Sequence, residues 1–144
     1  MKANHDLIET AKRAGSFQVF TRAVADAGFE ETLKMMGPYT VFAPTDQAFA
    51  RYPKAEFERL FKPQNKEGLQ LLLRNHIVPR KLMVSDLKSL DKMRNAKGEE
   101  LKIESRSGVW INEAKILLAD LEASNGVLHG IETVLTPHAQ VAHA

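Results

Sequence analysis

Apolar residues recur at helical spacing through the first two thirds of the chain. The clearest case follows Ser16, which we expect to cap a helix whose buried face contains Phe17, Phe20, Val24 and Ala27. A shorter helix should precede it, with Asp6 as its cap and Gly15 at its end. Further helices are predicted near residues 29–36, 45–52, 53–61 and 65–76, the last capped by Asn65, with one more helical turn at 85–90.

From Lys92 onward the pattern changes to the alternation of apolar and polar residues that is typical of strands. Strands are predicted on both sides of the turn Lys97-Gly98, and then at 109–111, 116–121 and 127–135. The turn before the last strand contains Asn125-Gly126, a strong hairpin signal between apolar runs. The pattern therefore predicts an α+β fold of mainly antiparallel strands, as one domain over residues 1–137 followed by a loose tail at 138–144.

One strand, Tyr39–Phe42, comes early and must reach across the domain to join the later strands. Pro44 should end it, because proline lacks the N–H that a sheet requires. Thr45 is a suitable N-cap for the next helix, and Asp46 places a carboxylate at the positive end of that helix. Thr45 and Asp46 thus form a small polar corner between an apolar strand and an apolar helix. Such a corner is either a packing feature or the edge of a functional site, and we expect it to be mainly a packing feature.

Charge and residue types narrow the function classes. Lys and Arg number 20 against 18 acidic residues, and a formal net charge of +2 gives no reason to expect nucleic acid as a partner. The chain has no cysteine, which excludes disulfides, thiolate catalysis and Cys-ligated metals. The histidines show no i, i+4 spacing of the kind found in helical zinc sites: His5, His76, His129, His138 and His143. We expect no metal and no cofactor.

No apolar run is long enough to span a membrane, so membrane insertion is not expected. The first residues, Met1–Asp6, lack the apolar core of a signal peptide. We therefore expect either that the protein stays inside the cell or that an export signal has been removed from it.

Three segments resemble the signature boxes of the fasciclin domain family, in the family's order. Residues 40–49 (TVFAPTDQAF) resemble the first signature box, 73–79 (LRNHIVP) the central tyrosine–histidine box, and 119–135 (ADLEASNGVLHGIETVL) the second signature box. The resemblance covers roughly residues 6–137. It gives the chain five signature positions, which we expect to be structural: Thr45, Asp46, His76, Asn125 and Gly126.

The resemblance implies a compact wedge of strands packed with short helices. It also implies an adhesion or ligand-binding role outside the cytoplasmic membrane, without catalysis. Fasciclin domains occur on cell surfaces and in extracellular matrices, where they bind proteins or carbohydrates. A lone domain without cysteine is most similar to the bacterial members of the family.

The chain departs from the family pattern at two places. Asn75 stands before His76, where the family has tyrosine. An Asp-Ile pair is implicated in integrin binding by animal members, and here Asp120 and Leu121 correspond to it with different neighbours, so integrin recognition is not expected. We expect the partner-binding surface to lie around these same residues: Asn75, His76, Asp120 and Leu121. Asp120 itself is expected to be solvated.

Thr45, Asp46 and His76 superficially resemble a nucleophile, an orienting carboxylate and a base. The competing interpretation is structural, with a buried His76 held by a hydrogen bond from the corner at Thr45 and Asp46. We favour the structural interpretation, because Thr45 already has a use as an N-cap and no oxyanion-hole glycine motif accompanies it.

The function predicted from the sequence is a non-catalytic adhesion or extracellular ligand-binding module. The expected partner is a cell-surface or matrix protein or a polysaccharide, and the domain is expected to be a monomer or a weak homo-oligomer. An intracellular or periplasmic structural interaction protein is the alternative, and a hydrolase-like activity of Thr45, Asp46 and His76 comes third.

Overall fold

The computed structural model describes residues 6–34, 38–52, 54–96, 98–105, 108–112 and 114–135. Its helices are α1 (Leu7–Ala14), α2 (Gln18–Ala27), α3 (Glu30–Lys34), α4 (Asp46–Ala50), α5 (Lys54–Leu60), the short 3₁₀ helix η1 (Pro63–Asn65), α6 (Lys66–Asn75) and α7 (Val84–Leu87). Its strands are β1 (Tyr39–Pro44), β2 (Ile77–Val78), β3 (Lys92–Arg94), β4 (Glu100–Ser105), β5 (Val109–Ile111), β6 (Ala114–Ala123) and β7 (Gly126–Ile131).

The strands form one seven-stranded sheet in the order β2-β1-β7-β6-β5-β4-β3. The early strand β1 lies between β2 and β7, as its expected reach across the domain requires. It runs parallel to β7, and the other pairs are antiparallel. The predicted α+β class with mainly antiparallel strands is therefore confirmed.

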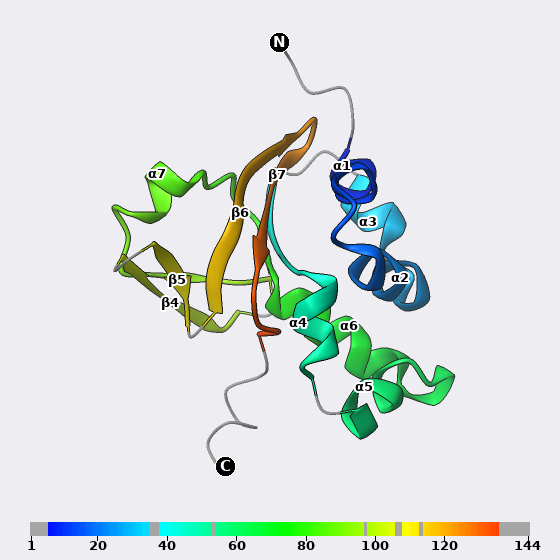
Figure 1. Ribbon diagram of the computed structural model, residues 1–144. Coiled ribbons are helices and arrows are strands. Elements are labelled where there is room, and N and C mark those ends of the chain that lie inside the picture. The colour runs from blue at the N-terminus through cyan, green and yellow to red at the C-terminus, as the bar shows by residue number, and fades with distance from the viewer. Residues whose placement is uncertain are drawn as a thin grey trace.

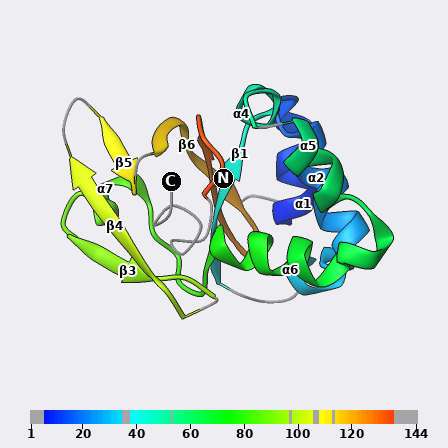
Figure 2. The ribbon, with the colours of Figure 1, turned by 90° about the horizontal axis from the view of Figure 1, so that it is seen from below.

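The sheet curls until its two ends meet. The backbone N–H of Ala96, just after β3, donates to the carbonyl of Ile77 in β2 over 2.6 Å. Figure 2 shows β3, β4 and β5 folded round beside the central strands. The result is nearly a barrel, which leaves little exposed strand edge at the junction of β2 and β3.

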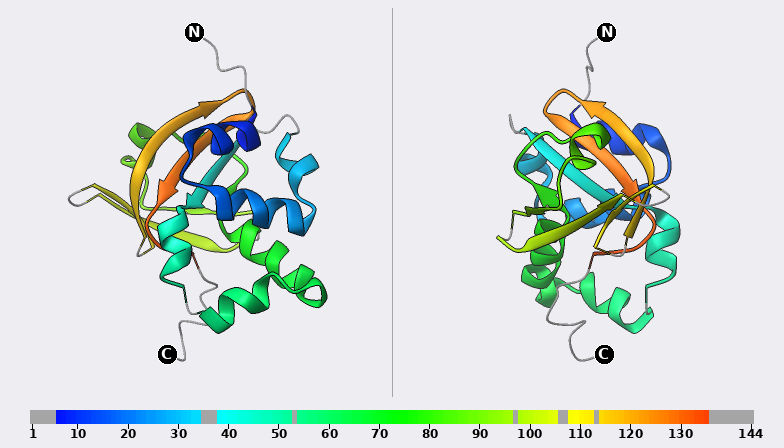
Figure 3. Two further views of the ribbon diagram at one scale, coloured as in Figure 1. Left: turned by 45° about the vertical axis from the view of Figure 1, so that its right-hand side comes forward. Right: turned by 90° about the vertical axis from the view of Figure 1, so that its left-hand side faces the viewer.

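Strands β1 and β7 separate two hydrophobic cores. Helices α1, α2, α3 and α6 cover one face of these strands, and the curled β3–β5 part with α7 lies on the other side (Figures 1 and 3). Successive residues of β1 alternate between the cores, with Val41 and Ala43 on the helical side and Phe42 on the other. Because both faces of β7 are covered, all of its residues are buried.

Two of the expected helix caps are wrong. Asp6 caps α1 as predicted, since its Oδ1 accepts from the Glu9 N–H at 2.9 Å. Ser16, however, does not cap α2, whose N-cap position is Phe17 and makes no side-chain cap bond. A carboxylate from a distant segment replaces the cap, because Asp46 Oδ1 accepts from the Val19 N–H at 2.8 Å.

Asn65 likewise makes no cap bond to α6. It is the last residue of η1, and its side-chain Nδ2 donates to the Arg59 carbonyl at 3.1 Å, which ties the η1 turn back to α5. Because Asn65 ends the 3₁₀ turn, its backbone does not have the extended conformation of a capping residue. The residue spacing in the sequence did not reveal this turn.

Several boundaries differ from the predicted ones. Strand β6 is longer than predicted at both ends, β7 ends at Ile131 rather than 135, and β2 was not predicted. The predicted end of the third helix at Met36, the turn residue Lys97 and the tail at 138–144 lie outside the described residues.

Candidate partner-binding site

The middle of β6 departs from regular pairing at Asp120. Its pairing with β7 shifts between Ile116 and Leu118, and again between Leu118 and Leu121. Asp120 adopts a left-handed backbone conformation with φ of 58°, which aspartate tolerates better than most residues. A bulge of this kind bends the strand and changes the direction of its side chains.

The buried side chain of His129 on β7 stabilises the bulge through hydrogen bonds. The His129 Nδ1 accepts from the Asp120 N–H at 3.0 Å, and its Nε2 lies 2.8 Å from the Leu82 carbonyl. These contacts place the ring proton on Nε2, which donates to that carbonyl. The ring also stacks on Phe42, with centroids 5.6 Å apart. Burial lowers the pKa of His129, so the neutral ring that this arrangement needs is favoured.

The Asp120 side chain is fixed as well. Its Oδ1 accepts from the Val84 N–H at 2.9 Å, at the first residue of α7. The side chain is still 40% exposed, and its Oδ1 lies 3.9 Å from the His129 Nδ1. The expectation that Asp120 is solvated is therefore met only in part, because one oxygen is held by α7.

Exposed apolar side chains precede this carboxylate on β6. Leu117 is 50% exposed and Leu118 is 39% exposed, and Ala119 is exposed too. We call Leu117, Leu118, Ala119 and Asp120 the β6 patch. Beyond it Leu121 is half-buried against the helical core, and Glu122 forms an exposed ion pair with Lys81 at 3.4 Å. The patch combines apolar area with one oriented negative charge.

The central box is a buried junction. Asn75 and His76, at the end of α6, are both buried. The Asn75 Nδ2 donates to the Leu135 carbonyl at 3.0 Å, and its Oδ1 accepts from the Asn95 Nδ2 at 2.9 Å. In this conformation neither Asn75 nor His76 presents a surface to a partner, which corrects their expected place in the binding surface.

The His76 ring joins α6 to the end of the domain. Its Nε2 accepts from the Leu135 N–H at 2.8 Å, so its Nδ1 carries the proton and donates to the Leu72 carbonyl at 2.8 Å. Burial lowers the pKa of His76 to about 4. Its hydrogen bond to β1 comes from the backbone, since its carbonyl accepts from the Phe42 N–H at 2.8 Å. The expected side-chain bond from the corner at Thr45 and Asp46 is wrong.

At the corner itself, Thr45 and Asp46 cap two different helices. The Thr45 Oγ1 accepts from the Ala48 N–H at 3.2 Å and caps α4, as predicted. Asp46 begins α4, but its carboxylate caps α2 through Val19. The hydrogen bonds of Thr45, Asp46 and His76 lead to three separate places, so the structure does not assemble them into a catalytic relay.

Asn125 and Gly126 tie the β6–β7 hairpin to the helical layer and to β1. The Asn125 Oδ1 accepts from the Leu7 N–H at 3.1 Å, and its Nδ2 donates to the Leu33 carbonyl at 2.6 Å. At Gly126 a Cβ atom would lie only 2.0 Å from the Tyr39 carbonyl oxygen. Glycine is required there because the β1 backbone passes too close for any side chain.

Within the described residues, no group of three or more His, Asp or Glu side chains is arranged to hold a metal ion. The described helices are also too short or too polar for any of them to cross a bilayer. Every buried side-chain nitrogen and oxygen in the described part of the chain has a hydrogen-bond partner.

Comparison with solved structures defines the class of fold. The domain pair of the insect cell adhesion molecule fasciclin I matches with a TM-score of 0.83 at 16% sequence identity, covering 96% of this chain and 53% of that one. The chain therefore has the fold of one domain of that pair. A sequence model described as "Fasciclin domain" matches residues 15–137, and the chain belongs to the fasciclin domain family.

The curated relatives differ in how much of their length this chain represents. It is 38% identical to Protein sll1483 of Synechocystis sp. over 91% of this chain and 73% of that protein. It is 33% identical to the Synechocystis protein sll1735 over 90% of this chain and 96% of that one. It also shares 34% identity with the transforming growth factor-beta-induced protein ig-h3 of Sus scrofa over 92% of this chain, but spans only 19% of that protein. The Synechocystis relatives agree with the expected similarity to bacterial members.

Sequence reasoning missed the structural roles of His129 and Asn95. His129 interrupts the apolar run Val127–Ile131, and a polar residue inside a buried strand is the signal that could have revealed its role. Asn95 sits in a turn, where an asparagine has a local explanation, and its bond to Asn75 joins segments 20 residues apart.

Proposed function

We propose that the chain is a non-catalytic binding module that acts outside the cytoplasmic membrane and recognises a protein or polysaccharide through the β6 patch. The single observation that carries this proposal is the bulge at Asp120. There, His129 holds the Asp120 backbone and α7 holds its carboxylate, beside the exposed side chains of Leu117 and Leu118. A pre-organised carboxylate of this kind loses little conformational entropy on binding.

Family membership supports an adhesion role. The solved relative of the same fold is described as a cell adhesion molecule, and this chain carries that family's domain over most of its length. Leu121, beside the patch, is half-buried and serves mainly to anchor it to the helical core. The recognised partner therefore meets Leu117, Leu118 and Asp120 first.

The arrangement of Thr45, Asp46 and His76 supports a function without catalysis. Both ring nitrogens of His76 are bonded to backbone groups, and the Thr45 hydroxyl is used as a cap. A general base needs a free nitrogen within reach of a proton to abstract. The intracellular form of the same binding function stays the alternative, and locating the protein in fractionated cells distinguishes the two.

The test is a binding screen of the purified domain against surface proteins and polysaccharides from its own source. Positive partners are then measured against Leu117→Lys and against Leu71→Lys, which changes a leucine of α6 that is 41% exposed. We expect Leu117→Lys to weaken binding about tenfold or more and Leu71→Lys to leave it unchanged. Equal effects of the two variants, with both still folded, would refute the β6 patch as the binding surface.

A further inference from the structure

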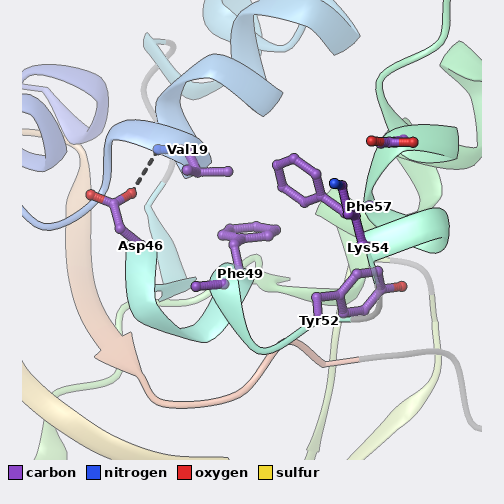
Figure 4. A pocket seen from close by; sticks show the side chains of 8 residues that line it. Val19, Asp46, Phe49, Tyr52, Lys54 and Phe57 are labelled. Carbon is purple, nitrogen blue, oxygen red and sulfur yellow. Dashed lines mark hydrogen bonds between the residues drawn. The ribbon is translucent and has the colours of Figure 1, made fainter.

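A pocket opens on the helical side of the domain, at a place that the proposed function does not use. It lies between α2, α4 and α5 and has a volume of about 440 Å³. Its lining includes Val19, Asp46, Phe49, Lys54, Phe57 and Glu58. Figure 4 shows the Phe49 ring at its centre, with the side chains of Val19 and Phe57 directed towards it. This volume is in the range of pockets that bind a small molecule.

The floor of the pocket is aromatic. The rings of Phe49 and Phe57 meet edge to face with centroids 6.1 Å apart, and Phe57 packs against Phe61 in the same way at 4.9 Å. Beside the pocket, the Arg22 guanidinium lies 4.4 Å from the centroid of the Phe61 ring, which belongs to this cluster but not to the lining. Aromatic faces attract cations through their quadrupole, and the attraction is stronger where water is excluded.

The charged residues of the lining favour a cation as well. Asp46 and Glu58 contribute two carboxylates, and Lys54 contributes the one ammonium group. Asp46 is held in place by the Val19 N–H at 2.8 Å, so its charge has a fixed position at one end of the pocket (Figure 4). An anionic ligand would face two like charges and one opposite charge, whereas an organic cation would face two opposite charges and the one like charge of Lys54.

From this geometry we propose that the pocket binds a small organic cation, a protonated amine joined to an aromatic or branched apolar body. The apolar body lies against Phe49, Phe57 and Val19, and the ammonium group is attracted by the two carboxylates of the lining, Asp46 and Glu58. The site is distinct from the β6 patch, because β6 lies beside β7 in the sheet and away from α4 and α5 (Figure 1). One domain would then bind a macromolecule and a small cation at separate surfaces.

The test is an NMR titration of the purified domain with three probes of nearly the same shape: phenethylamine, phenethyl alcohol and phenylpropionate. We expect the amine to bind with a Kd on the order of 1 mM, as suits a ligand of this size, and to shift the signals of Val19, Phe49 and Phe57. The alcohol should bind about fivefold more weakly and the acid more weakly still.

Two variants of exposed residues on α5 test the role of charge without disturbing the core. Glu58→Gln should reduce the preference for amine over alcohol by about threefold, and Lys54→Gln should increase it by a similar factor. Glu67→Gln, an exposed carboxylate on α6, is the matched control and should change nothing. Equal binding of amine and alcohol, preference for the acid, no binding up to about 20 mM, or shifts confined to other surfaces would each overturn the proposal.

Discussion

The end of α6 and the middle of β6 each place a polar side chain next to a buried histidine, but they use it differently. At the end of α6, the side chains of Asn75 and His76 are both buried and form their hydrogen bonds within the protein. In β6 the His129 ring accepts from the backbone N–H of Asp120, while the Asp120 carboxylate reaches the surface. The first region has the features of a structural junction and the second those of a presented surface.

The two histidines also hold their protons on opposite nitrogens. His76 donates through Nδ1 and accepts through Nε2, whereas His129 accepts through Nδ1 and donates through Nε2. In both cases a backbone N–H needs an unprotonated ring nitrogen. Protonation therefore removes an acceptor in each region, but only at β6 would it alter the shape of an exposed segment.

The largest expected effect is acid destabilisation through His76. Its pKa is lowered to about 4 in the folded protein, against about 6.5 in the unfolded chain, so the unfolded state takes up the proton first as the pH falls. Stability is thus complete above pH 6.5 and decreases towards pH 4, by about 3 kcal/mol from this residue. Chemical denaturation at a series of pH values measures the loss.

A His76→Gln variant tests whether His76 causes this loss of stability at low pH. It should be less stable than the parent at pH 7 and should show a shallower decrease between pH 6.5 and 4. The decrease should not vanish, because burial lowers the pKa of His129 with the same sign. An unchanged pH dependence in the variant would show that His76 is not the responsible group.

The next effect concerns the Asn75 side chain. Asn75→Ala should cost about 2 kcal/mol, because it leaves the Leu135 carbonyl and one proton of the Asn95 amide without their partner in a buried place. A double-mutant cycle with Asn95→Ala should give a coupling energy of at least about 0.5 kcal/mol. Additive effects would mean that the junction is not a cooperative unit.

A smaller effect is expected at Thr45. Thr45→Ala should lower the free energy of unfolding by about 1 kcal/mol through loss of the α4 cap, and Thr45→Ser should restore most of it. Partner binding should be the same in both variants. A binding defect in a fully stable Thr45→Ala protein would point back to the corner as a functional site.

The smallest expected effect on stability is at the β6 patch. Leu117→Lys should change the free energy of unfolding by no more than about 0.5 kcal/mol, because the side chain is half exposed. Thermal unfolding followed by circular dichroism measures this. A large loss of stability would place Leu117 in the structural group with Asn75 and would weaken the contrast between the regions.

The sequence predicted the parts of the fold that depend on local pattern. Asp6 and Thr45 were assigned as caps because cap chemistry extends over only three residues, and the hairpin at Asn125-Gly126 has its own turn signal. The early place of Tyr39–Phe42 in the chain indicated that this strand joins the later ones, but its parallel pairing with β7 was not predicted. What local reasoning could not supply were contacts between distant segments, such as the Asp46 cap on α2 and the Asn75–Asn95 pair.

In the candidate site, too, the sequence indicated individual residues but not their tertiary contacts. Asp120 was selected from the resemblance, but its bulge, its left-handed backbone and its anchoring by His129 arise from strand register and tertiary packing. Conversely, Asn75 was placed in the expected binding surface because it stands before His76 in the central box, where the family has tyrosine. Burial by the segment at Leu135 reverses that assignment.

The most direct test of the contrast is hydrogen exchange of the domain with and without a partner obtained from the binding screen. We expect added protection at the amides of residues 117–120, and no change at Asn75 and His76, which are already buried in the free protein. Protection that begins at the end of α6 and leaves β6 unaffected would contradict the account.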